Sequence, residues 1–166
     1  AFTVSIDGKD GVSTGISAFD RHRTIQLMVG DDTRGDDFAR PGHIFPLIAR
    51  DGGVLVRAGQ TEGSVDLSRL AGLKPMAVIC EVMNEDGMMA RQSDLERFGH
   101  EHGIKLCTVK DLIEYRMLNE RLVRKQVETK LPTEFGEFDL MAYENVIDGA
   151  VHLALLPPDG PTGGFF

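Results

Sequence analysis

The stretch that decides the fold is Met76-Ala77-Val78-Ile79-Cys80, which is apolar throughout, as is typical of a β-strand covered on both faces. A helix is predicted before it, over about residues 64–73. Another is predicted after it, over about residues 93–103, where Ser93-Asp94-Leu95-Glu96 has the pattern of a capping box. Apolar runs at residues 54–56 and 104–109 add further strands. Because strands alternate with helices, we expect an α/β fold, with a mixed sheet and helices on its faces.

Toward the N-terminus, residues 2–6 (Phe-Thr-Val-Ser-Ile) alternate apolar and polar side chains, which predicts a half-buried strand. A second capping box, Ser17-Ala18-Phe19-Asp20, predicts a helix that runs to about Val29 and stops at Gly30. Residues 31–38 are acidic and show no apolar period, so we expect a solvated loop there rather than a metal site.

Toward the C-terminus, a helix is predicted over residues 110–119, and the composition then changes. Residues 120–130 are charged with few apolar anchors, which favours a linker between a first domain at 1–119 and a separate segment at 131–166. Alternating side chains and the turn pair Asp148-Gly149 predict a β-hairpin at the start of that segment. The Pro- and Gly-rich stretch from residue 157 is expected to hold no regular structure.

Composition excludes several classes of protein. The 166 residues carry 18 basic and 26 acidic side chains, a formal net charge of −8, which disfavours nucleic acid as a partner. No apolar run approaches the roughly 18–20 residues that a membrane helix needs. Two cysteines, Cys80 and Cys107, make no disulfide framework and suit the reducing cytoplasm. The chain opens at Ala1 inside a strand pattern, so we expect that residues precede it in the natural protein.

Three segments carry residues suited to chemistry. His43 follows Arg-Pro-Gly at the mouth of a predicted strand, where it can act as acid, base or ligand, or be a structural histidine. Residues 57–61, Arg-Ala-Gly-Gln-Thr, join a strand to a helix and make either an anion site or an ordinary connection. Glu81 ends the apolar strand. Partial burial there would raise its pKa and suit proton transfer, whereas a loop carboxylate is the alternative.

Together these segments resemble a known family. The blocks that carry the resemblance are Phe2–Asp7, Thr14–Arg21, Arg40–Leu47, Gly52–Glu62, Leu70–Pro75 and Ile79–Gly87. In this order they resemble 3,4-dihydroxy-2-butanone 4-phosphate synthase, over residues 1 to about 117. Residues 128–138, Glu-Thr-Lys-Leu-Pro-Thr-Glu-Phe-Gly-Glu-Phe, resemble the opening of GTP cyclohydrolase II. A synthase followed by a cyclohydrolase is the arrangement of the bifunctional riboflavin-biosynthesis proteins.

The resemblance implies a reaction and a set of site residues. The family converts D-ribulose 5-phosphate to 3,4-dihydroxy-2-butanone 4-phosphate and formate, as a homodimer, with Mg²⁺ or Mn²⁺. His43 and Glu81 match its acid/base pair, and the Arg57 loop matches its substrate loop, with Arg57 and Thr61 suited to the phosphate. The implied substrate contacts are Thr14, Arg57, Ala58, Gly59, Gln60, Thr61 and Glu81, and Asp20 and Arg21 lie in a block that lines the same pocket.

Two departures bear on activity. Gln60 stands where the family has a metal-binding histidine, so a metal at this position would be held by a neutral amide oxygen and bound more weakly. The family's acidic N-terminal loop, which supplies the other metal ligand, has no counterpart in this sequence. We therefore expect reduced or absent formate release. The second hypothesis is a non-catalytic phosphosugar-binding or dimerisation remnant of a bifunctional protein.

Overall fold

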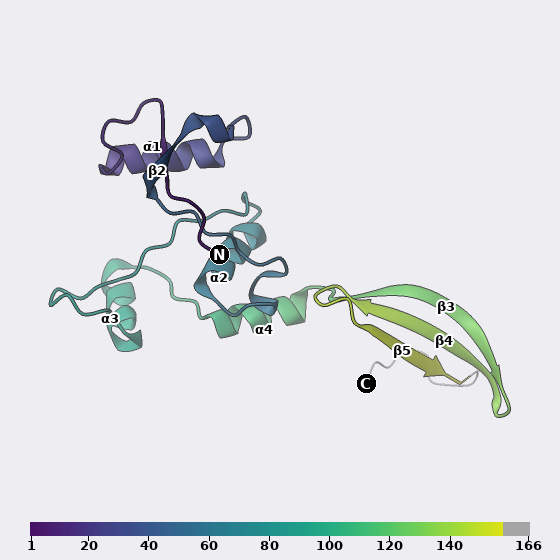
Figure 1. Ribbon diagram of the computed structural model, residues 1–166. Helices are drawn as coiled ribbons and strands as arrows, with labels where there is room; N and C mark the ends of the chain where they lie inside the picture. Colours follow the sequence, from purple (N-terminus) through teal and green to yellow (C-terminus); the bar gives the residue numbers. More distant parts are fainter. Residues whose placement is uncertain (158–166) are drawn as a thin grey trace. The chain divides into compact units, whose positions relative to one another are not determined.

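The computed structural model describes residues 1–157 and divides into two compact units, Ala1–Leu112 and Ile113–Phe166, called here the N-terminal and C-terminal units (Figure 1). The described helices are α1 (Ala18–Val29), α2 (Gln60–Leu70), α3 (Gln92–His102) and α4 (Val109–Asn119), with short 3₁₀ helices η1 (Gly35–Asp37) and η2 (Gly53–Leu55). The described strands are β1 (Ile6–Gly8), β2 (Phe38–Ile44), β3 (Val123–Thr133), β4 (Gly136–Asn145) and β5 (Val151–Leu156). The expected mixed α/β class is confirmed.

Strand β1 pairs with β2 in an antiparallel ribbon, with Asp7 opposite Ala39. The register shifts between Ile6 and Asp7, so Ile6 lies opposite Ile44 at the far end of β2. A shift of this kind bends and twists a strand locally. As a result, β1 is tied to both ends of β2.

Two strand boundaries differ from the prediction. Continuous pairing does not span residues 2–6: Phe2 forms only an isolated bridge to Leu47, and β1 starts at Ile6. His43 was expected just before a strand but lies within β2. The alternation of residues 2–6 continues past Ile6, and a period of two alone cannot say where pairing begins.

Helix α1 begins and ends where the sequence predicts. The Ser17 hydroxyl accepts a hydrogen bond from the Asp20 backbone N–H at 3.1 Å, and Gly30 follows the last turn. The helix lies beside the β1–β2 ribbon (Figure 1) and is joined to it by buried Thr24, whose Oγ1 accepts the Gly8 N–H at 2.9 Å. A local capping signal and one buried hydroxyl thus place α1 against the sheet.

The segment before α2 is a correction. Residues 54–56 do not form the expected strand, because the chain turns through η2 with Gly52 and Gly53 at φ values of +87° and +64°. These left-handed conformations suit glycine and end an extended run. Helix α2 then starts at Gln60, earlier than residue 64, so Gln60 and Thr61 form its first turn.

The strands predicted at residues 76–80 and 104–109 are wrong. Residues 76–80, all described, have no regular secondary structure, and Val78 is 70% exposed. Residues 104–108 are likewise irregular and exposed, and Val109 already belongs to α4. A strand needs a hydrogen-bonded neighbour, and the described residues provide none for either segment.

The last two helices are confirmed with small differences in their bounds. Helix α3 begins at Gln92, where Asp94 accepts the Arg91 backbone N–H at 2.9 Å, so the cap lies two residues before the predicted Ser93. It ends at Gly103, as predicted, with φ +65°. Helix α4 begins one residue before the expected position.

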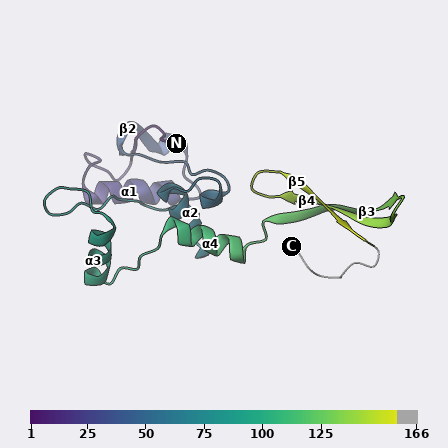
Figure 2. The same cartoon turned by 90° about the horizontal axis from the view of Figure 1, so that it is seen from below.

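The C-terminal unit contains most of α4 and a three-stranded antiparallel sheet in the order β3-β4-β5 (Figure 1), which Figure 2 shows as a twisted ribbon. The predicted hairpin is confirmed as β4 and β5, with Gly149 at φ +72° in the turn. Residues 123–130, expected within a linker, instead belong to β3. Charged pairs across the strands support this polar strand: Lys130 Nζ lies 2.7 Å from Asp139 Oδ1.

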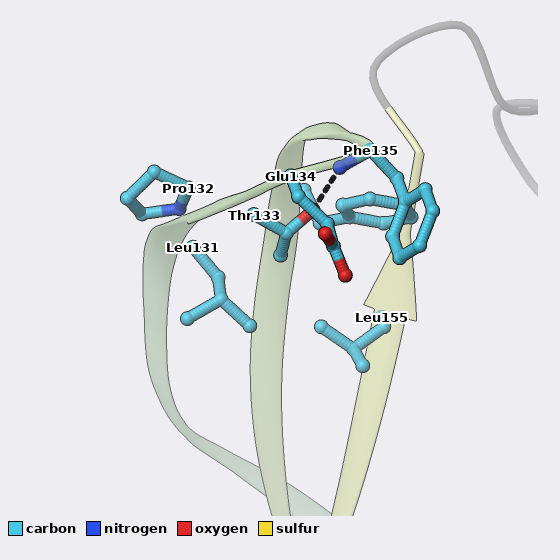
Figure 3. Close-up of a pocket in the computed structure, with 7 residues that line it drawn as sticks. Leu131, Pro132, Thr133, Glu134, Phe135 and Leu155 are labelled. Atoms are coloured by element: carbon cyan, nitrogen blue, oxygen red, sulfur yellow. Dashed lines mark hydrogen bonds between the residues drawn. The ribbon is translucent and has the colours of Figure 1, made fainter.

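A cavity of about 540 Å³ lies at the β3–β4 turn of this sheet (Figure 3). Leu131, Phe135 and Leu155 contribute apolar side chains, and the Phe135 N–H donates to Thr133 Oγ1 at 3.2 Å. Most of its lining falls in the block 128–138 that resembles GTP cyclohydrolase II, and it includes none of the predicted catalytic, substrate-binding or metal residues. The Pro- and Gly-rich stretch from residue 158 onward lies outside the described residues.

Candidate functional site

A cavity of about 760 Å³ in the N-terminal unit brings the main predicted residues together. His43 enters it from β2, Thr61 from the first turn of α2, and Glu81 from the irregular segment after Pro75. Arg21, on α1, adds a cation to the lining. Apolar side chains make up most of the remaining wall, and the few polar groups share this one cavity.

The other predicted residues lie outside this lining. Among the described residues, Thr14 and the stretch 57–60 do not line the cavity, although 57–60 leads directly into Thr61. Gln60 is exposed at the start of α2, after the N-cap residue Gly59. The substrate loop expected from the sequence is therefore divided, with Thr61 on the cavity and the preceding residues beside it.

His43 is fixed by two hydrogen bonds to one carboxylate, that of Asp7. The His43 backbone N–H donates to Asp7 Oδ1 at 2.9 Å, and the ring Nδ1 lies 2.7 Å from Asp7 Oδ2. Burial raises the pKa of Asp7, but these hydrogen bonds and the nearby imidazole hold the pKa below its ordinary value. Because an ionised carboxylate only accepts hydrogen bonds, Nδ1 carries the proton, and Nε2 is the atom available for proton exchange.

Asp7 is a site residue that the sequence analysis did not identify. The pair is separated by 36 positions in the chain and meets only through the register of β1 and β2. No local pattern signals such a contact. The alternation of residues 2–6 predicts a strand next to Asp7 but does not identify the residue that Asp7 contacts.

A second carboxylate, Asp20, organises the loop that covers the Asp7–His43 pair. It accepts hydrogen bonds from the backbone N–H and hydroxyl of Ser13, at 3.1 and 2.8 Å, and from the Gly15 N–H at 3.0 Å. A Cβ on Gly15 would come within 2.2 Å of Asp7 Oδ2 and 2.6 Å of His43 Nδ1. Only glycine therefore fits this close approach, and Asp20 keeps it in place.

Acid is expected to loosen this loop. Hydrogen bonds from the backbone N–H and the hydroxyl of Ser13 are the main cause that lowers the pKa of Asp20 to about 2, from an ordinary value of 3.8. The folded state thus binds the Asp20 proton more weakly than the unfolded state does. Ionised Asp20 therefore stabilises the folded state at pH values above the pKa of Asp20 in the unfolded chain. This contribution is lost as the pH falls from about 4 to about 2. In urea titrations, Asp20→Asn should be less stable than the unmodified protein near pH 6. Between pH 6 and pH 3 it should lose less stability than the unmodified protein does.

The control is Asp10→Asn, which removes an exposed carboxylate from the neighbouring turn. It should leave the acid-induced loss of stability near that of the unmodified protein. If Asp20→Asn loses as much stability on acidification as Asp10→Asn, the assignment of this pH dependence to Asp20 is incorrect.

Arg57, in the loop before α2, makes an ion pair with Glu62 in the first turn of that helix. Its Nη1 lies 2.9 Å from Glu62 Oε2, with the Arg57 side chain 57% exposed and the Glu62 side chain fully buried. Glu62 also accepts the Arg50 backbone N–H at 3.0 Å. The sequence reasoning assigned no role to Glu62, although a glutamate in the first turn of a helix is a common signal for capping.

Glu81 lies on the cavity without the burial that the sequence suggested. The residue is exposed, because the segment before it is irregular rather than a covered strand. The partial burial expected from the sequence is therefore wrong. What places Glu81 in the site is its position on the same cavity as His43 and Thr61.

The described side chains do not assemble a complete metal site. Within residues 1–157, no three side chains of His, Cys, Asp or Glu lie close enough together to hold an ion. Glu81 offers a carboxylate and Gln60 an amide oxygen, the kind of ligand that hard cations take. Within the same residues, no helix combines the length and apolar character required to cross a bilayer.

Comparison with known proteins identifies the family. The model of the 3,4-dihydroxy-2-butanone 4-phosphate synthase family matches residues 1–115, which include the whole cavity. The chain therefore belongs to this family, as the sequence blocks predicted. Residues 124–161 match the model of GTP cyclohydrolase II, which confirms the second resemblance.

Individual relatives agree with this assignment. The 3,4-dihydroxy-2-butanone 4-phosphate synthase of Pseudomonas aeruginosa is 53% identical over 154 residues, covering 93% of this chain and 42% of the relative. The riboflavin biosynthesis protein RibBA of Synechocystis is 52% identical, covering 96% of this chain and 29% of the relative. The chain thus spans less than half the length of these curated relatives.

Solved structures show the same fold. RibBX of A. baumannii, a two-domain 3,4-dihydroxy-2-butanone 4-phosphate synthase, superposes with a TM-score of 0.80 at 47% identity, covering 95% of this chain and 47% of that one. A 3,4-dihydroxy-2-butanone 4-phosphate synthase in complex with two magnesium ions gives a TM-score of 0.63 at 35% identity, covering 72% and 61%.

Proposed function

We propose that the cavity of the N-terminal unit converts D-ribulose 5-phosphate to 3,4-dihydroxy-2-butanone 4-phosphate and formate, a step of riboflavin biosynthesis. One observation carries the proposal. His43, Thr61 and Glu81, from three segments separated in the sequence, line one cavity inside the region that matches the synthase family. The Asp7 contact holds the imidazole in a defined orientation, which a proton-transfer group requires.

In this proposal His43 and Glu81 exchange protons with the substrate. Removal of a proton beside the ketone of a ketose phosphate needs a base, and the later loss of water needs an acid. His43 acts through Nε2, since Nδ1 donates to Asp7. Glu81 lies on the same cavity and acts as the second group.

The remaining predicted residues are proposed to hold the substrate. Thr61 offers a hydroxyl on the cavity, and Arg57 supplies a charge suited to the phosphate from the preceding loop. The other proposed contacts, with the backbone or side chain, are Thr14, Ala58, Gly59 and Gln60. Arg21 lines the cavity and provides a second cation for the same anion.

We also propose that a divalent cation, Mg²⁺ or Mn²⁺, takes part. A related synthase has been solved with two magnesium ions. Such an ion would polarise the substrate oxygens. The described residues do not complete its ligand set, so the proton transfers above are assigned to the side chains alone.

Replacing Gln60 with His is expected to tighten Mn²⁺ binding about tenfold and Mg²⁺ binding less, because Mn²⁺ gains more from an imidazole nitrogen than Mg²⁺, which prefers oxygen ligands. Calorimetric titration of each ion into the two proteins measures this. Gln92→His, at the exposed start of α3, is the control and should bind as the unmodified protein does. Equal affinities for Gln60→His and the control would rule out Gln60 as a metal position.

A non-catalytic role in phosphosugar binding or dimerisation is the second candidate. Gln60 in place of the expected histidine favours it, as does the lack of a three-ligand metal cluster among residues 1–157. A module of this kind would retain the cavity, with Arg21 and Thr61 on its wall, but not the chemistry. It therefore predicts binding without turnover.

One experiment separates these candidates. Ribulose 5-phosphate is titrated into the chain by calorimetry, and formate is measured with and without Mg²⁺. We expect binding, with metal-dependent formate release slower than that of the Pseudomonas aeruginosa relative. Binding with no formate would support the non-catalytic phosphosugar-binding module. An absence of binding would contradict both the synthase activity and phosphosugar binding, and would leave only the dimerisation role.

For the rest of the chain, we propose a synthase part at residues 1–119 and a GTP cyclohydrolase II-like part that includes residues 131–166. Because β3 belongs to the second sheet, residues 123–130 are assigned to the latter part. We further propose a cytoplasmic homodimer without nucleic-acid or membrane partners. The net charge of −8 and the free thiols of Cys80 and Cys107 are consistent with this proposal.

A further inference from the structure

Two buried carboxylates on α2 face the loop that precedes the helix. Glu62 is 0% exposed and Asp66 is 1% exposed, and they lie one helical turn apart on the same face. Neither lines the cavity. Burying a carboxylate costs free energy unless it is paired or hydrogen-bonded. The partners of Glu62 and Asp66 therefore show which parts of the loop each carboxylate stabilises.

Glu62 holds the loop at two points. One oxygen accepts the Arg50 backbone N–H at 3.0 Å, and the other lies 2.9 Å from Arg57 Nη1. Burial raises the pKa of Glu62, but the hydrogen bonds from the backbone N–H groups of Arg50 and of Glu62 itself, together with the Arg57 charge, hold the pKa below its ordinary value. Glu62 is therefore an anion that anchors an otherwise half-exposed arginine.

Asp66 holds a different part of the same loop. Its Oδ2 accepts the Val54 backbone N–H at 2.8 Å, and its Oδ1 lies 3.4 Å from Arg69 Nη1. A Cβ on Gly53 would lie 2.2 Å from either Asp66 oxygen, so the turn packs directly on this carboxylate. Asp66 thus supports the η2 turn and provides a matched comparison for Glu62.

We propose that Glu62 is a positioning residue, which sets where the Arg57 guanidinium stands for a phosphosugar bound at the cavity. The proposal rests on the proposed function. A guanidinium carries five donors, and the pair with Glu62 occupies Nη1 while the side chain remains 57% exposed. The donors on its other edge can therefore bind a phosphate. Because the pair with Glu62 already orders this long side chain, less conformational entropy is lost when the phosphate binds.

The first test compares Glu62→Gln with Asp66→Asn. Both remove a buried carboxylate from α2, and both are expected to lower the urea midpoint of unfolding. Only Glu62→Gln should weaken the calorimetric binding of ribulose 5-phosphate, by about fivefold, the cost of ordering one free side chain. In an Arg57→Ala background, the further effect of Glu62→Gln should disappear.

Three outcomes would overturn the proposal. Equal weakening by Glu62→Gln and Asp66→Asn would show a general structural effect. Tighter binding in Glu62→Gln would show that Glu62 competes with the phosphate for Arg57. An unchanged effect of Glu62→Gln in the Arg57→Ala background would show that Glu62 does not act through Arg57.

A second readout does not depend on the substrate. Phenylglyoxal modifies accessible arginines, and peptide mapping by mass spectrometry reports the rate at Arg57 itself. Release of Arg57 from its carboxylate should raise this rate severalfold in Glu62→Gln and leave it unchanged in Asp66→Asn. If the unmodified protein does not bind ribulose 5-phosphate, the proposed function is wrong. The labelling then tests by itself whether Glu62 positions Arg57. Equal labelling rates in the unmodified protein, Glu62→Gln and Asp66→Asn would overturn that role.

Discussion

Replacing His43 with Gln is expected to lower the rate of formate release by about 10²- to 10⁴-fold, the contribution of a positioned acid/base group. Glutamine keeps a polar side chain but cannot exchange a proton near neutral pH. The formate assay with saturating ribulose 5-phosphate measures the loss. Binding of the substrate should change much less, because the proposed role of His43 lies in the chemical steps.

Two variants control for this result. His22→Gln removes an exposed imidazole from α1 and should leave the rate unchanged. Asp7→Asn removes the carboxylate that orients the ring, so it should reduce the rate less than His43→Gln does and alter its pH profile. A His43→Gln protein with an unaltered rate would remove His43 from the proposed mechanism.

Replacing Gly42 with Ala is expected to cost about 3 kcal/mol of stability, at the upper end for an overpacked site. A Cβ at this position would lie 2.0 Å from the backbone carbon of Ile6 and 2.3 Å from the backbone nitrogen of Asp7. These atoms belong to the paired strand β1, so they cannot move aside as a flexible side chain would. The ribbon must separate at the point where Asp7 meets His43.

The matched control is Gly63→Ala, inside α2. A Cβ there meets only side-chain atoms at 3.8 Å, an ordinary van der Waals distance. Because alanine favours a helix more than glycine, this variant should be more stable by about 0.5–1 kcal/mol. Urea denaturation of both proteins measures the difference. Equal stabilities would show that β1 and β2 approach less closely than described.

Local signals predicted the elements that local interactions hold. The Ser17 cap and Gly30 bound α1, and Gly149 turns the β4–β5 hairpin, each through hydrogen bonds or dihedral angles within a few residues. The strand prediction for the apolar run at residues 76–80 was wrong because apolar composition indicates only a preference for burial. Strand formation also requires a partner.

The polar strand β3 was not predicted, for the opposite reason. Its side chains are almost all exposed, so it lacks the apolar alternation that marks a strand, and pairs such as Lys130 with Asp139 support it instead. The sequence also named His43, Thr61 and Glu81, which the fold gathers on one cavity, but not Asp7 or Glu62. Those two act through contacts whose partners only the folded chain identifies.

The register of β1 and β2 also sets where the chain tolerates changes in length. Residues 30–34, between α1 and η1, are mostly exposed and lie outside the pairing, so an insertion there leaves Asp7 opposite the same part of β2. One residue added between Ala39 and His43, where the register shifts, would move His43 away from Asp7. Among homologues, loop-length variation should therefore concentrate before residue 35, and the spacing from Phe38 to His43 should stay constant.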